Sequence, residues 1–410
     1  MKVLIYGINY HPEVTGIGKY TGEMATWLAA RGHDVRVVTA PPYYPQWQVA
    51  DGYAAGRYQL EQRDGVAVYR CPLWVPARVS GLKRLVHLAS FAASSLPVMI
   101  RQAFWRPDVV WMAAPALFCA PGALLAAKLG GAKSWLHVQD YEVDAAFELG
   151  LLKQPAARRF ALAVERGLLR AFDCVSSISG RMLALAREKG VAPSQVVSFP
   201  NWVVLPPASL AAEAAAYRQA LGIAPDTVVA LYSGNMGAKQ GLETLAETAR
   251  QFAAQPGQPL LFLFCGQGTG RAALEQACHG LANVRFMDLQ PVEKLPAFLQ
   301  MADIHLLPQK AGAADLVMPS KLTGMLASGR PVVACAAPGT ELANVVAGKG
   351  VVIAPESVPD MVAAISLLAA DSPLRQQYGQ AGRRYAEQFL DQDAIMAAFE
   401  KQLQQLCGQP

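Results

Sequence analysis

Polar and charged side chains gather in one short segment of the first half of the sequence. The segment follows the apolar run that begins at Ser134, and its members are His137, Gln139, Asp140, Glu142 and Asp144. Together an imidazole, an amide and carboxylates could orient a polar ligand through hydrogen bonds. The alternatives are a satisfied core histidine and acids that cap a helix.

A second stretch with chemical potential begins at Pro319. The types of Pro319 and Ser320 predict a helix start, because proline suits the first turn and serine can cap free backbone N–H groups. The helix should run from Ser320 to Ala327, and Gly329 should end it. A helix start that carries Ser320 and Lys321 is a natural diphosphate site. The alternative is an ordinary capped helix with a solvated lysine.

Three glycine-containing loops follow apolar runs and precede helical patterns. They are Gly16-Ile-Gly18, the loop from Gly234 to Gly241, and Cys265-Gly-Gln-Gly268. Loops of this kind let a ligand approach the backbone closely and can offer N–H groups to phosphate. The first loop is not the dinucleotide-binding fingerprint, because its third glycine, Gly22, falls one position too late.

These residues need strands and helices that bring them to one edge of a sheet. Apolar runs predict strands at 3–8, 35–38, 66–70, 108–112, 134–138, 175–179 and 196–199, and again at 227–233, 260–264, 283–287, 303–307, 332–334 and 351–353. Helical patterns fill the gaps, so the chain is α/β with two Rossmann-like parallel-sheet domains. Ligands of such sheets gather at the carboxyl ends of the strands.

The amino-acid composition and net charge limit the classes of ligand that the protein is expected to bind. The 410 residues are 53% apolar and 16% charged, with a net charge of +5. This mild basicity fits an anionic substrate or an anionic membrane face and is too weak to indicate nucleic acid. The seven cysteines form no CxxC pair, so neither a zinc site nor a disulfide framework is indicated and we expect a reducing compartment. Asp391-Gln-Asp393 is interpreted as helix capping, so no metal is assigned, and no signal peptide is expected.

Two further segments have open interpretations. Pro41-Pro-Tyr-Tyr-Pro-Gln-Trp47 is an aromatic, proline-stiffened loop that could stack on sugar rings or serve as a structural lid. The apolar run from Leu85 to Ile100 has basic residues on both sides and is too short to span a membrane. We interpret this run as a buried helix with a basic end and keep contact with anionic lipid as a hypothesis.

The motifs together resemble the two-domain GT-B glycosyltransferases, in particular family 4, the retaining nucleotide-sugar enzymes. The strings that carry the resemblance are Gly16-Ile-Gly18-Lys-Tyr, Tyr232-Ser-Gly-Asn-Met-Gly, Cys265-Gly-Gln-Gly268 and the stretch from Pro319-Ser-Lys-Leu to Val333. The resemblance covers essentially the whole chain. It implies domains at 1–204, completed by a last helix at 388–410 that crosses back, and at 205–387, facing across a cleft.

The resemblance also implies roles for single residues. An acceptor would bind the first domain and a nucleotide-sugar the second, without a metal or other cofactor. Residues assigned by position to the donor nucleotide and diphosphate are Gly16, Gly18, Gly234, Asn235, Lys239, Gly266, Ser320, Lys321 and Leu322. Asp315 and Glu341 are assigned to the donor sugar. For catalysis we expect Asp140 to orient groups near the acceptor, with His137 as a supporting hydrogen-bond donor and Gln139 as a third candidate.

Three departures from the family pattern leave roles open. The usual arginine and lysine of the first loop in the second domain are replaced by Asn235 and Gln240. A pair of glutamates spaced eight apart is missing, since Leu316 and Gly324 stand there. The histidine that normally precedes an aspartate directly is replaced by Gln139.

Longer strings, such as Gly7 to Met24 and Ala40 to Val49, resemble family members that build colanic-acid-type exopolysaccharide. This resemblance favours GDP-fucose over a UDP-sugar as donor and a lipid-linked saccharide as acceptor. We therefore expect a cytoplasmic enzyme, with peripheral contact to the inner membrane as a hypothesis. The alternatives are a GT-B enzyme that uses a UDP-sugar and a soluble acceptor, and a non-catalytic nucleotide-sugar-binding partner.

Overall fold

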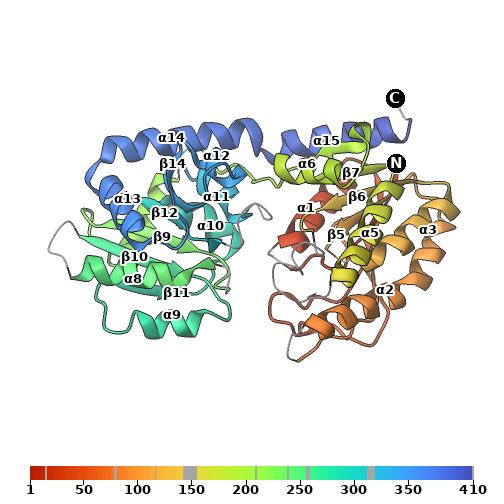
Figure 1. The fold of residues 1–410 in the computed structure, drawn as a ribbon, viewed down its shortest axis with the longest axis horizontal. Helices are drawn as coiled ribbons and strands as arrows, with labels where there is room; N and C mark the ends of the chain where they lie inside the picture. The colour runs from red at the N-terminus through yellow and green to blue at the C-terminus, as the bar shows by residue number, and fades with distance from the viewer. Residues whose placement is uncertain are drawn as a thin grey trace. The chain divides into compact units, whose positions relative to one another are not determined.

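The computed structural model describes residues 1–13, 16–77, 81–115, 117–141, 155–207, 210–237, 240–254, 259–311 and 319–408. The chain divides into two compact units, 1–200 with 393–410 and 201–392 (Figure 1). The boundaries expected from the sequence lie within a few residues of this division. Each unit is an α/β domain built on its own parallel sheet, as the sequence predicted.

The first unit contains an eight-stranded sheet in the order β3-β4-β2-β1-β5-β6-β7-β8. Its strands are β1 (Lys2–Tyr6), β2 (Asp34–Thr39), β3 (Gln59–Arg63), β4 (Val66–Arg70), β5 (Val109–Ala114), β6 (Lys133–Val138), β7 (Cys174–Ser177) and β8 (Val196–Ser198). All neighbours are parallel except β3 and β4. The strand order reverses between β1 and β5, so a ligand site is expected beyond their carboxyl ends.

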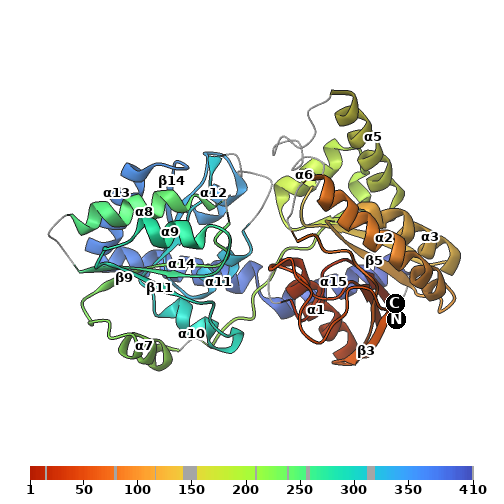
Figure 2. The same cartoon turned by 90° about the horizontal axis from the view of Figure 1, so that it is seen from below.

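Helices cover both faces of this sheet. They are α1 (Gly16–Ala30), α2 (Gly81–Ala103), α3 (Ala120–Gly130), α5 (Pro155–Ala171), α6 (Gly180–Glu188) and α15 (Gln392–Leu406). Figure 2 shows α2, α3 and α5 on one side of the sheet and α1 with α15 on the other.

The last helix, α15, belongs to the first unit although it follows the second in sequence. Phe399 stacks on Phe199 with ring centroids 4.2 Å apart. Glu400 accepts a hydrogen bond from Nε2 of His33 (2.7 Å) and pairs with Arg31 (3.0 Å). These contacts confirm the expected crossing of the C-terminal helix onto the first domain.

The second unit contains a six-stranded parallel sheet in the order β11-β10-β9-β12-β13-β14. Its strands are β9 (Val228–Ser233), β10 (Leu260–Cys265), β11 (Val284–Met287), β12 (Ile304–Leu307), β13 (Val332–Cys335) and β14 (Gly350–Ile353). The order reverses between β9 and β12. The loops after these two strands therefore flank the point where ligands of open α/β sheets bind.

The core of the second unit has two layers, one on each face of the sheet, because the side chains of each strand alternate between the faces. The helices around the sheet are α7 (Ala211–Ala220), α8 (Leu242–Ala253), α9 (Arg271–Ala277), α10 (Leu295–Gln300), α11 (Lys321–Ala327), α12 (Glu341–Val346), α13 (Val358–Ala370) and α14 (Ser372–Phe389). Val228 and Tyr232 pack with α8 and α13, whereas Val229 and Leu231 pack with α7 and α10. Successive side chains point to opposite faces, so the apolar run of β9 is buried on both sides.

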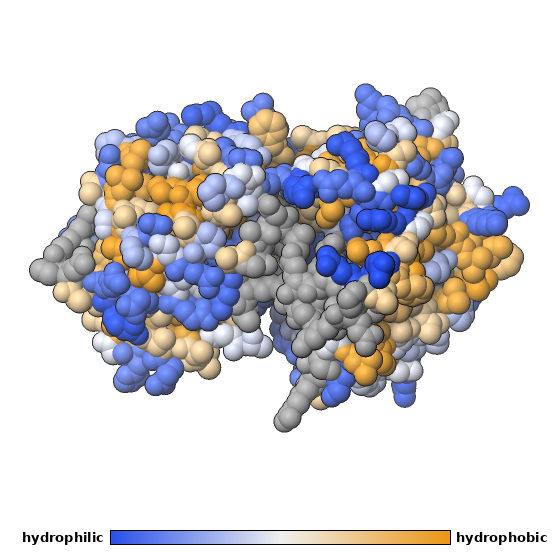
Figure 3. Space-filling model, in the orientation of Figure 1, coloured by the Kyte–Doolittle hydropathy of each residue, from blue (hydrophilic) through white to orange (hydrophobic). Residues whose placement is uncertain are grey.

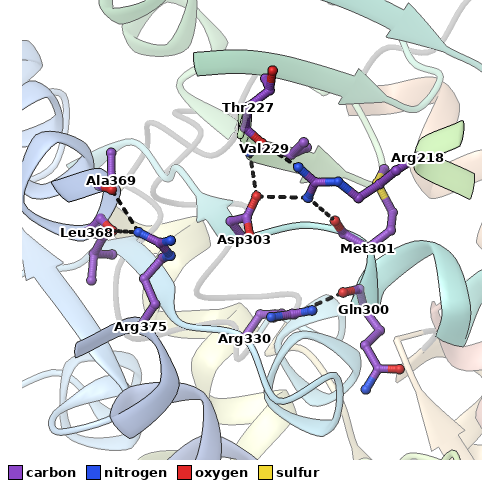
Figure 4. Close-up of polar contacts among 10 residues, drawn as sticks. All are labelled: Arg218, Thr227, Val229, Gln300, Met301, Asp303, Arg330, Leu368, Ala369 and Arg375. Carbon is purple, nitrogen blue, oxygen red and sulfur yellow. Dashed lines mark hydrogen bonds and ion pairs between the residues drawn. The ribbon is translucent and has the colours of Figure 1, made fainter. Parts of the chain in front are cut away.

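An arginine network fixes the amino ends of β9 and β12 (Figure 4). Arg218 donates to Oδ2 of Asp303 and to the Met301 carbonyl, both at 3.0 Å, and the Val229 amide donates to the same Asp303 oxygen at 2.8 Å. Arg330 and Arg375 donate to carbonyl oxygens at helix ends. These contacts lie opposite the carboxyl edge of the sheet: Arg218 joins α7 to β12 and to the end of α10, and Arg375 joins α14 to α13.

Two differences from the predicted elements have simple causes. Strand β3 was not predicted, because Gln59–Arg63 is polar and lies at the sheet edge, where its burial is incomplete. The final helix was expected at 388–410, but α14 ends at Phe389 and α15 runs over Gln392–Leu406. Asp393 lies in the first turn of α15 and accepts a hydrogen bond from Nε1 of Trp27 at 3.1 Å.

Candidate functional site

In the second unit, the loops after β9 and β10 are packed against each other. A Cβ on Gly266 would lie 2.0 Å from the carbonyl oxygen of Gly234, so only glycine fits at position 266. The Gly234 amide donates to the Cys265 carbonyl (2.9 Å), and the Gly266 amide donates to the Met287 carbonyl (3.1 Å). These amides are therefore not available to phosphate, contrary to the expectation from sequence, whereas the Asn235 side chain is exposed at this edge.

Lys321 is a charged group at the carboxyl edge of the second sheet. Its half-buried side chain lies against Gly234, and Nζ sits 4.3 Å from the Tyr232 ring centroid. Nζ also donates to Oε1 of Gln240 at 2.9 Å. Within the described part of the chain Lys321 forms no ion pair. Burial lowers the pKa of this lysine to about 7.

Helix α11 differs in detail from its prediction. It begins at Lys321, and the Ser320 side chain makes no capping hydrogen bond. The backbone of Ser320 is itself helical (φ −58°, ψ −26°), whereas a capping residue is normally extended. Leu322 is buried in the core, and its amide donates to the Pro319 carbonyl at 3.0 Å. Leu322 therefore positions the helix without presenting a polar group to a ligand.

Glu341 is the residue assigned to the donor sugar that the structure describes. Glu341 is the half-buried first residue of α12, beyond the carboxyl end of β13. Thr340 caps that helix by accepting from the Ala343 amide at 3.2 Å. Lys239 and Asp315 lie outside the described residues. No group of three or more His, Cys, Asp or Glu side chains among the residues that the structure covers could hold a metal ion.

In the first unit, a carboxylate that sequence analysis did not single out organises the carboxyl edge. Glu13, 5% exposed, accepts hydrogen bonds from the amides of Tyr43 and Tyr44 (both 3.0 Å) and from Nδ2 of Asn9 (2.9 Å). Burial raises the pKa of Glu13, and these hydrogen bonds oppose the shift. The only signal in sequence is an acid in the loop that follows the first strand.

Gly16 and Gly18 lie at the start of α1 and have different constraints. Gly16 has φ +58° and open space around its Cβ position, whereas a Cβ on Gly18 would lie 2.8 Å from both Cβ and Oε2 of Glu13. Glycine at position 18 is thus required by the approach of Glu13.

We expect Gly18→Ala to destabilise the first unit by about 1–3 kcal/mol, because Glu13 must shift away from its amide partners. The measurement is thermal unfolding of both variants against the unchanged protein. Gly167→Ala is the matched control: Gly167 lies inside α5 with nothing near its Cβ position, so alanine should stabilise that helix by up to about 1 kcal/mol. Equal melting temperatures for the two variants would contradict the role given to Glu13.

The histidine of the predicted catalytic cluster is a core residue. His137 is 2% exposed and lies near-parallel to Trp111, with ring centroids 5.4 Å apart. Its Nδ1 is 2.9 Å from Oγ of Ser176, and its Nε2 is 3.3 Å from Nε2 of Gln139. Burial lowers the pKa of His137 to about 3, so the ring is neutral at physiological pH. His137 is therefore the satisfied core histidine that the sequence left as an alternative. Its Nε2 faces Gln139, so an effect of His137 on a ligand would pass through Gln139.

Asp140 points to the other face of β6 and is the member of the cluster that reaches a pocket. The lining consists of Ala114, Leu117, Leu136, Val138, Asp140, Tyr141, Glu165 and Leu169. Asp140 is half-buried, whereas Gln139 is buried and its amide donates to the Ala114 carbonyl at 3.1 Å. The Gln139 side chain contacts His137, whereas Asp140 lines the pocket together with Leu136 and Val138, so the two side chains serve different surroundings. Glu142 and Asp144 lie outside the described residues.

Comparison with known proteins matches both units. Residues 15–202 match the Glycosyl transferase 4-like domain, and residues 213–385 match the Glycosyl transferases group 1 family. The chain belongs to the family 4 GT-B glycosyltransferases. The enzyme is 48% identical over 409 residues to WcaI of Escherichia coli (strain K12), which is named as a colanic acid biosynthesis glycosyl transferase. The match covers 97% of this chain and 98% of WcaI.

Solved structures support the fold of the glycosyltransferase. Sucrose-phosphate synthase from Thermosynechococcus elongatus matches with a TM-score of 0.77 at 17% identity, over 99% of both chains. Anabaena HepE in complex with UDP and glucose matches with a TM-score of 0.70 at 14% identity, over 99% of this chain and 100% of HepE. At these identities the likeness shows the GT-B fold and not the substrates.

Proposed function

We propose that the enzyme is a retaining glycosyltransferase that moves a sugar from a nucleoside diphosphate donor to a lipid-linked saccharide in colanic-acid-type exopolysaccharide biosynthesis. Donor binding is assigned to the second unit and acceptor binding to the first. The observation that carries the donor assignment is Lys321, a half-buried cation with neutral described partners beside the β9–β12 switch point. A desolvated ammonium without a carboxylate favours an anionic ligand, and a diphosphate is such a ligand.

GDP-fucose is the first donor to test, because WcaI is named for colanic acid biosynthesis. Incubation with GDP- and UDP-sugars, followed by measurement of slow donor hydrolysis, distinguishes the alternatives. Hydrolysis of UDP-sugars alone would favour the UDP alternative. Nucleotide binding without hydrolysis or transfer would favour a non-catalytic partner.

The proposed donor site needs no metal cofactor. Lys321 supplies the positive charge for the leaving diphosphate, and Asn235 and Gln240 provide polar side chains at the same edge. Glu341, together with Asp315 and Lys239, stays assigned to the donor by resemblance.

Asp140 is the proposed orienting group near the acceptor. Its half-buried carboxylate lines a small pocket at the carboxyl end of β6, two strands from β1 and next to the switch-point strand β5. A carboxylate can accept a hydrogen bond from the acceptor hydroxyl and fix it for transfer. Gln139 and His137 support the strand end from its other face.

Asp140→Asn should lower turnover by about tenfold or more, which is about 1.4 kcal/mol of barrier, and leave nucleotide affinity unchanged. The amide keeps the size of the carboxylate but loses its charge. Steady-state transfer rates and nucleotide titrations measure the two effects separately, and Asp51→Asn, at an exposed loop position of the same unit, is the control. An equal loss of nucleotide binding would remove Asp140 from the acceptor role.

A basic and apolar surface on the first unit supports a lipid-linked acceptor. Residues 81–106 contain no Asp or Glu and include Lys83, Arg84, Arg101 and Arg106. Exposed apolar side chains on or next to α2 and α3 are Leu82, Leu85, Val86, Leu96, Phe104, Phe118, Leu125 and Leu129. Figure 3 shows apolar residues over this part of the first unit. None of the described helices combines the length and hydropathy that a membrane crossing requires.

We propose that this basic-apolar surface lies against an anionic bilayer. Flotation with liposomes at low salt should recover the enzyme with anionic vesicles and much less with neutral ones. Leu82→Asp with Phe104→Asp should reduce flotation strongly, because Leu82 is 74% and Phe104 83% exposed and both charges would face lipid. The control is Leu289→Asp, an exposed position in the second unit. Equal flotation of all variants would exclude this surface.

A further inference from the structure

The aromatic loop at positions 41–47 has no role in the function proposed so far. It follows β2 at the carboxyl edge of the first sheet, and β2 pairs directly with the switch-point strand β1. Sequence analysis left two interpretations of this loop, a sugar platform and a structural lid.

Two buried charged side chains, Glu13 and Arg70, form hydrogen bonds with backbone groups in and next to the loop. Glu13 binds the amides of Tyr43 and Tyr44, as described above. The fully buried guanidinium of Arg70 donates to the carbonyl oxygens of Ala40 (3.0 Å) and His11 (2.5 Å). The start and the middle of the aromatic loop are thereby fixed, which fits a preorganised surface better than a segment that opens and closes.

Trp47 is held in an unfavourable backbone conformation. Its φ is +56°, a region that bulky residues rarely adopt. The indole packs against Tyr43 and His87, with ring centroids 5.7 Å and 5.1 Å away, yet the residue stays half-exposed. Such strain persists only where the surroundings enforce it, and it concentrates at ligand-binding positions.

The first turns of α2 (Gly81–Ala103) lie next to the aromatic loop. Burial is the main cause of the raised pKa of Tyr44; the Asp140 charge adds to it and the Arg84 charge opposes it. Trp47 packs against His87 of α2 with ring centroids 5.1 Å apart, and Arg84 lies about one helical turn before His87 on the same helix. Arg84 is exposed in the first turns of α2, beside the exposed apolar Leu82 and Leu85. An aromatic ring, a guanidinium and an apolar helix face are therefore neighbours on the first unit.

This combination of groups matches the parts of a lipid-linked sugar. We infer that Trp47 is the stacking platform for the acceptor sugar ring and that Arg84 binds the phosphate that joins this ring to its lipid. The inference rests on the proposed function and names the part of the acceptor that each residue recognises. An arginine fork suits phosphate, and an aromatic face suits the apolar side of a sugar ring.

Direct binding tests the inference without need of the donor. The probes are a water-soluble short-prenyl diphosphate glucose, the corresponding galactose compound, and the prenyl diphosphate without a sugar. Trp47→Gly removes the ring and suits the positive φ, so the loop backbone is preserved. Trp47→Phe keeps an aromatic ring, Arg84→Gln removes the charge, and Phe160→Ala, an exposed aromatic on α5, is the control.

For whichever sugar probe binds the unchanged protein more tightly, Trp47→Gly should weaken binding at least tenfold. It should leave the sugar-free probe within twofold, and Trp47→Phe should bind within about threefold of the unchanged protein. Arg84→Gln should weaken sugar-bearing and sugar-free probes alike. Binding by Trp47→Gly that equals that of Phe160→Ala, or no binding of either sugar probe by the unchanged protein, would overturn the inference. GDP and UDP titrations of the same samples report separately on the donor half of the proposed function.

Discussion

Replacing Lys321 with alanine will lower donor affinity by roughly 10- to 150-fold, the equivalent of about 1.5–3 kcal/mol for one charged diphosphate contact. The effect is expected at the upper end because the ammonium is already desolvated and lies against Tyr232 and Gly234. Titration with GDP, UDP and their sugar conjugates measures it, and EDTA should leave the result unchanged if no metal shares the diphosphate.

The matched control is Lys349→Ala. Lys349 is also half-buried over a tyrosine ring, with Nζ 4.8 Å from the Tyr385 centroid, but it directly precedes β14 at the amino edge of the sheet. Removal of this ammonium should not change donor affinity. If both variants lose affinity equally, the loss results from the lower net charge of the protein, and Lys321 makes no contact with the diphosphate.

The same lysine makes donor binding dependent on pH. Burial lowers the pKa of Lys321 from 10.5 to about 7, and a bound diphosphate would raise it again by stabilising the ammonium. Donor binding therefore takes up a proton above pH 7. Affinity should be flat below about pH 7 and fall as the pH rises above it, and Lys321→Ala should lose this slope.

Without donor, the stability of the protein should rise with pH, whereas donor affinity falls. A lysine with a lowered folded pKa binds fewer protons in the folded state than in the unfolded state between about pH 7 and 10.5, so its burial penalty fades as the pH rises through that window. Lys321→Met should therefore melt at a higher temperature than the unchanged protein at pH 6, and the difference should shrink toward pH 9. A higher stability with lost donor affinity is typical of a functional residue that is costly to bury.

The sheets were predictable from sequence because parallel strands buried on both faces are continuous apolar runs, as in Leu260–Cys265. Strand β3 was not predicted, because a strand at the sheet edge carries polar residues and forms no continuous apolar run. Asp64-Gly65, which precedes β4, is nevertheless a hairpin-turn signal. Residue type alone also suggested a cap at Ser320, which the helical backbone of that residue does not allow.

Site residues were harder to predict, because their roles depend on contacts between distant segments. Glu13 meets Tyr43 and Tyr44 across about thirty residues, and nothing local predicts that contact. Lys321 was found because a lysine at a helix start has a local signature, but Gln240 as its partner was not. His137 lies inside β6 and is buried, whereas Asp140 follows the end of the strand, is half-buried and lines a pocket, and sequence alone did not separate the two.

Breaking the buried pair between Lys189 and Glu165 will have the largest effect on the stability of the first unit. The two side chains are 5% and 3% exposed and form a hydrogen-bonded ion pair, and Nζ of Lys189 also lies 5.2 Å from the Tyr141 ring centroid. Lys189→Met or Glu165→Gln should each cost about 3–5 kcal/mol, because one charge would remain buried without its partner. In a unit of this size, that lowers the melting temperature by about 10 °C.

The double variant, Glu165→Leu with Lys189→Met, should recover most of this loss, since two apolar side chains of similar volume replace the pair. Arg181 and Glu188 are the surface control, 2.8 Å apart with side chains 49% and 56% exposed. Glu188→Gln should cost less than about 1 kcal/mol. Calorimetry is the suitable measurement, because it separates the transitions of two domains.

The double variant also tests what the pair does at the acceptor site. Glu165 and Tyr141 line the same pocket as Asp140, and the ammonium of Lys189 lies over the Tyr141 ring. If stability returns and transfer does not, the pair orients Asp140 and Tyr141 for the acceptor. If both return, the pair serves folding alone and Asp140 is positioned by β6. Single variants as stable as the Glu188→Gln control would show that the charges are solvated and that neither role applies.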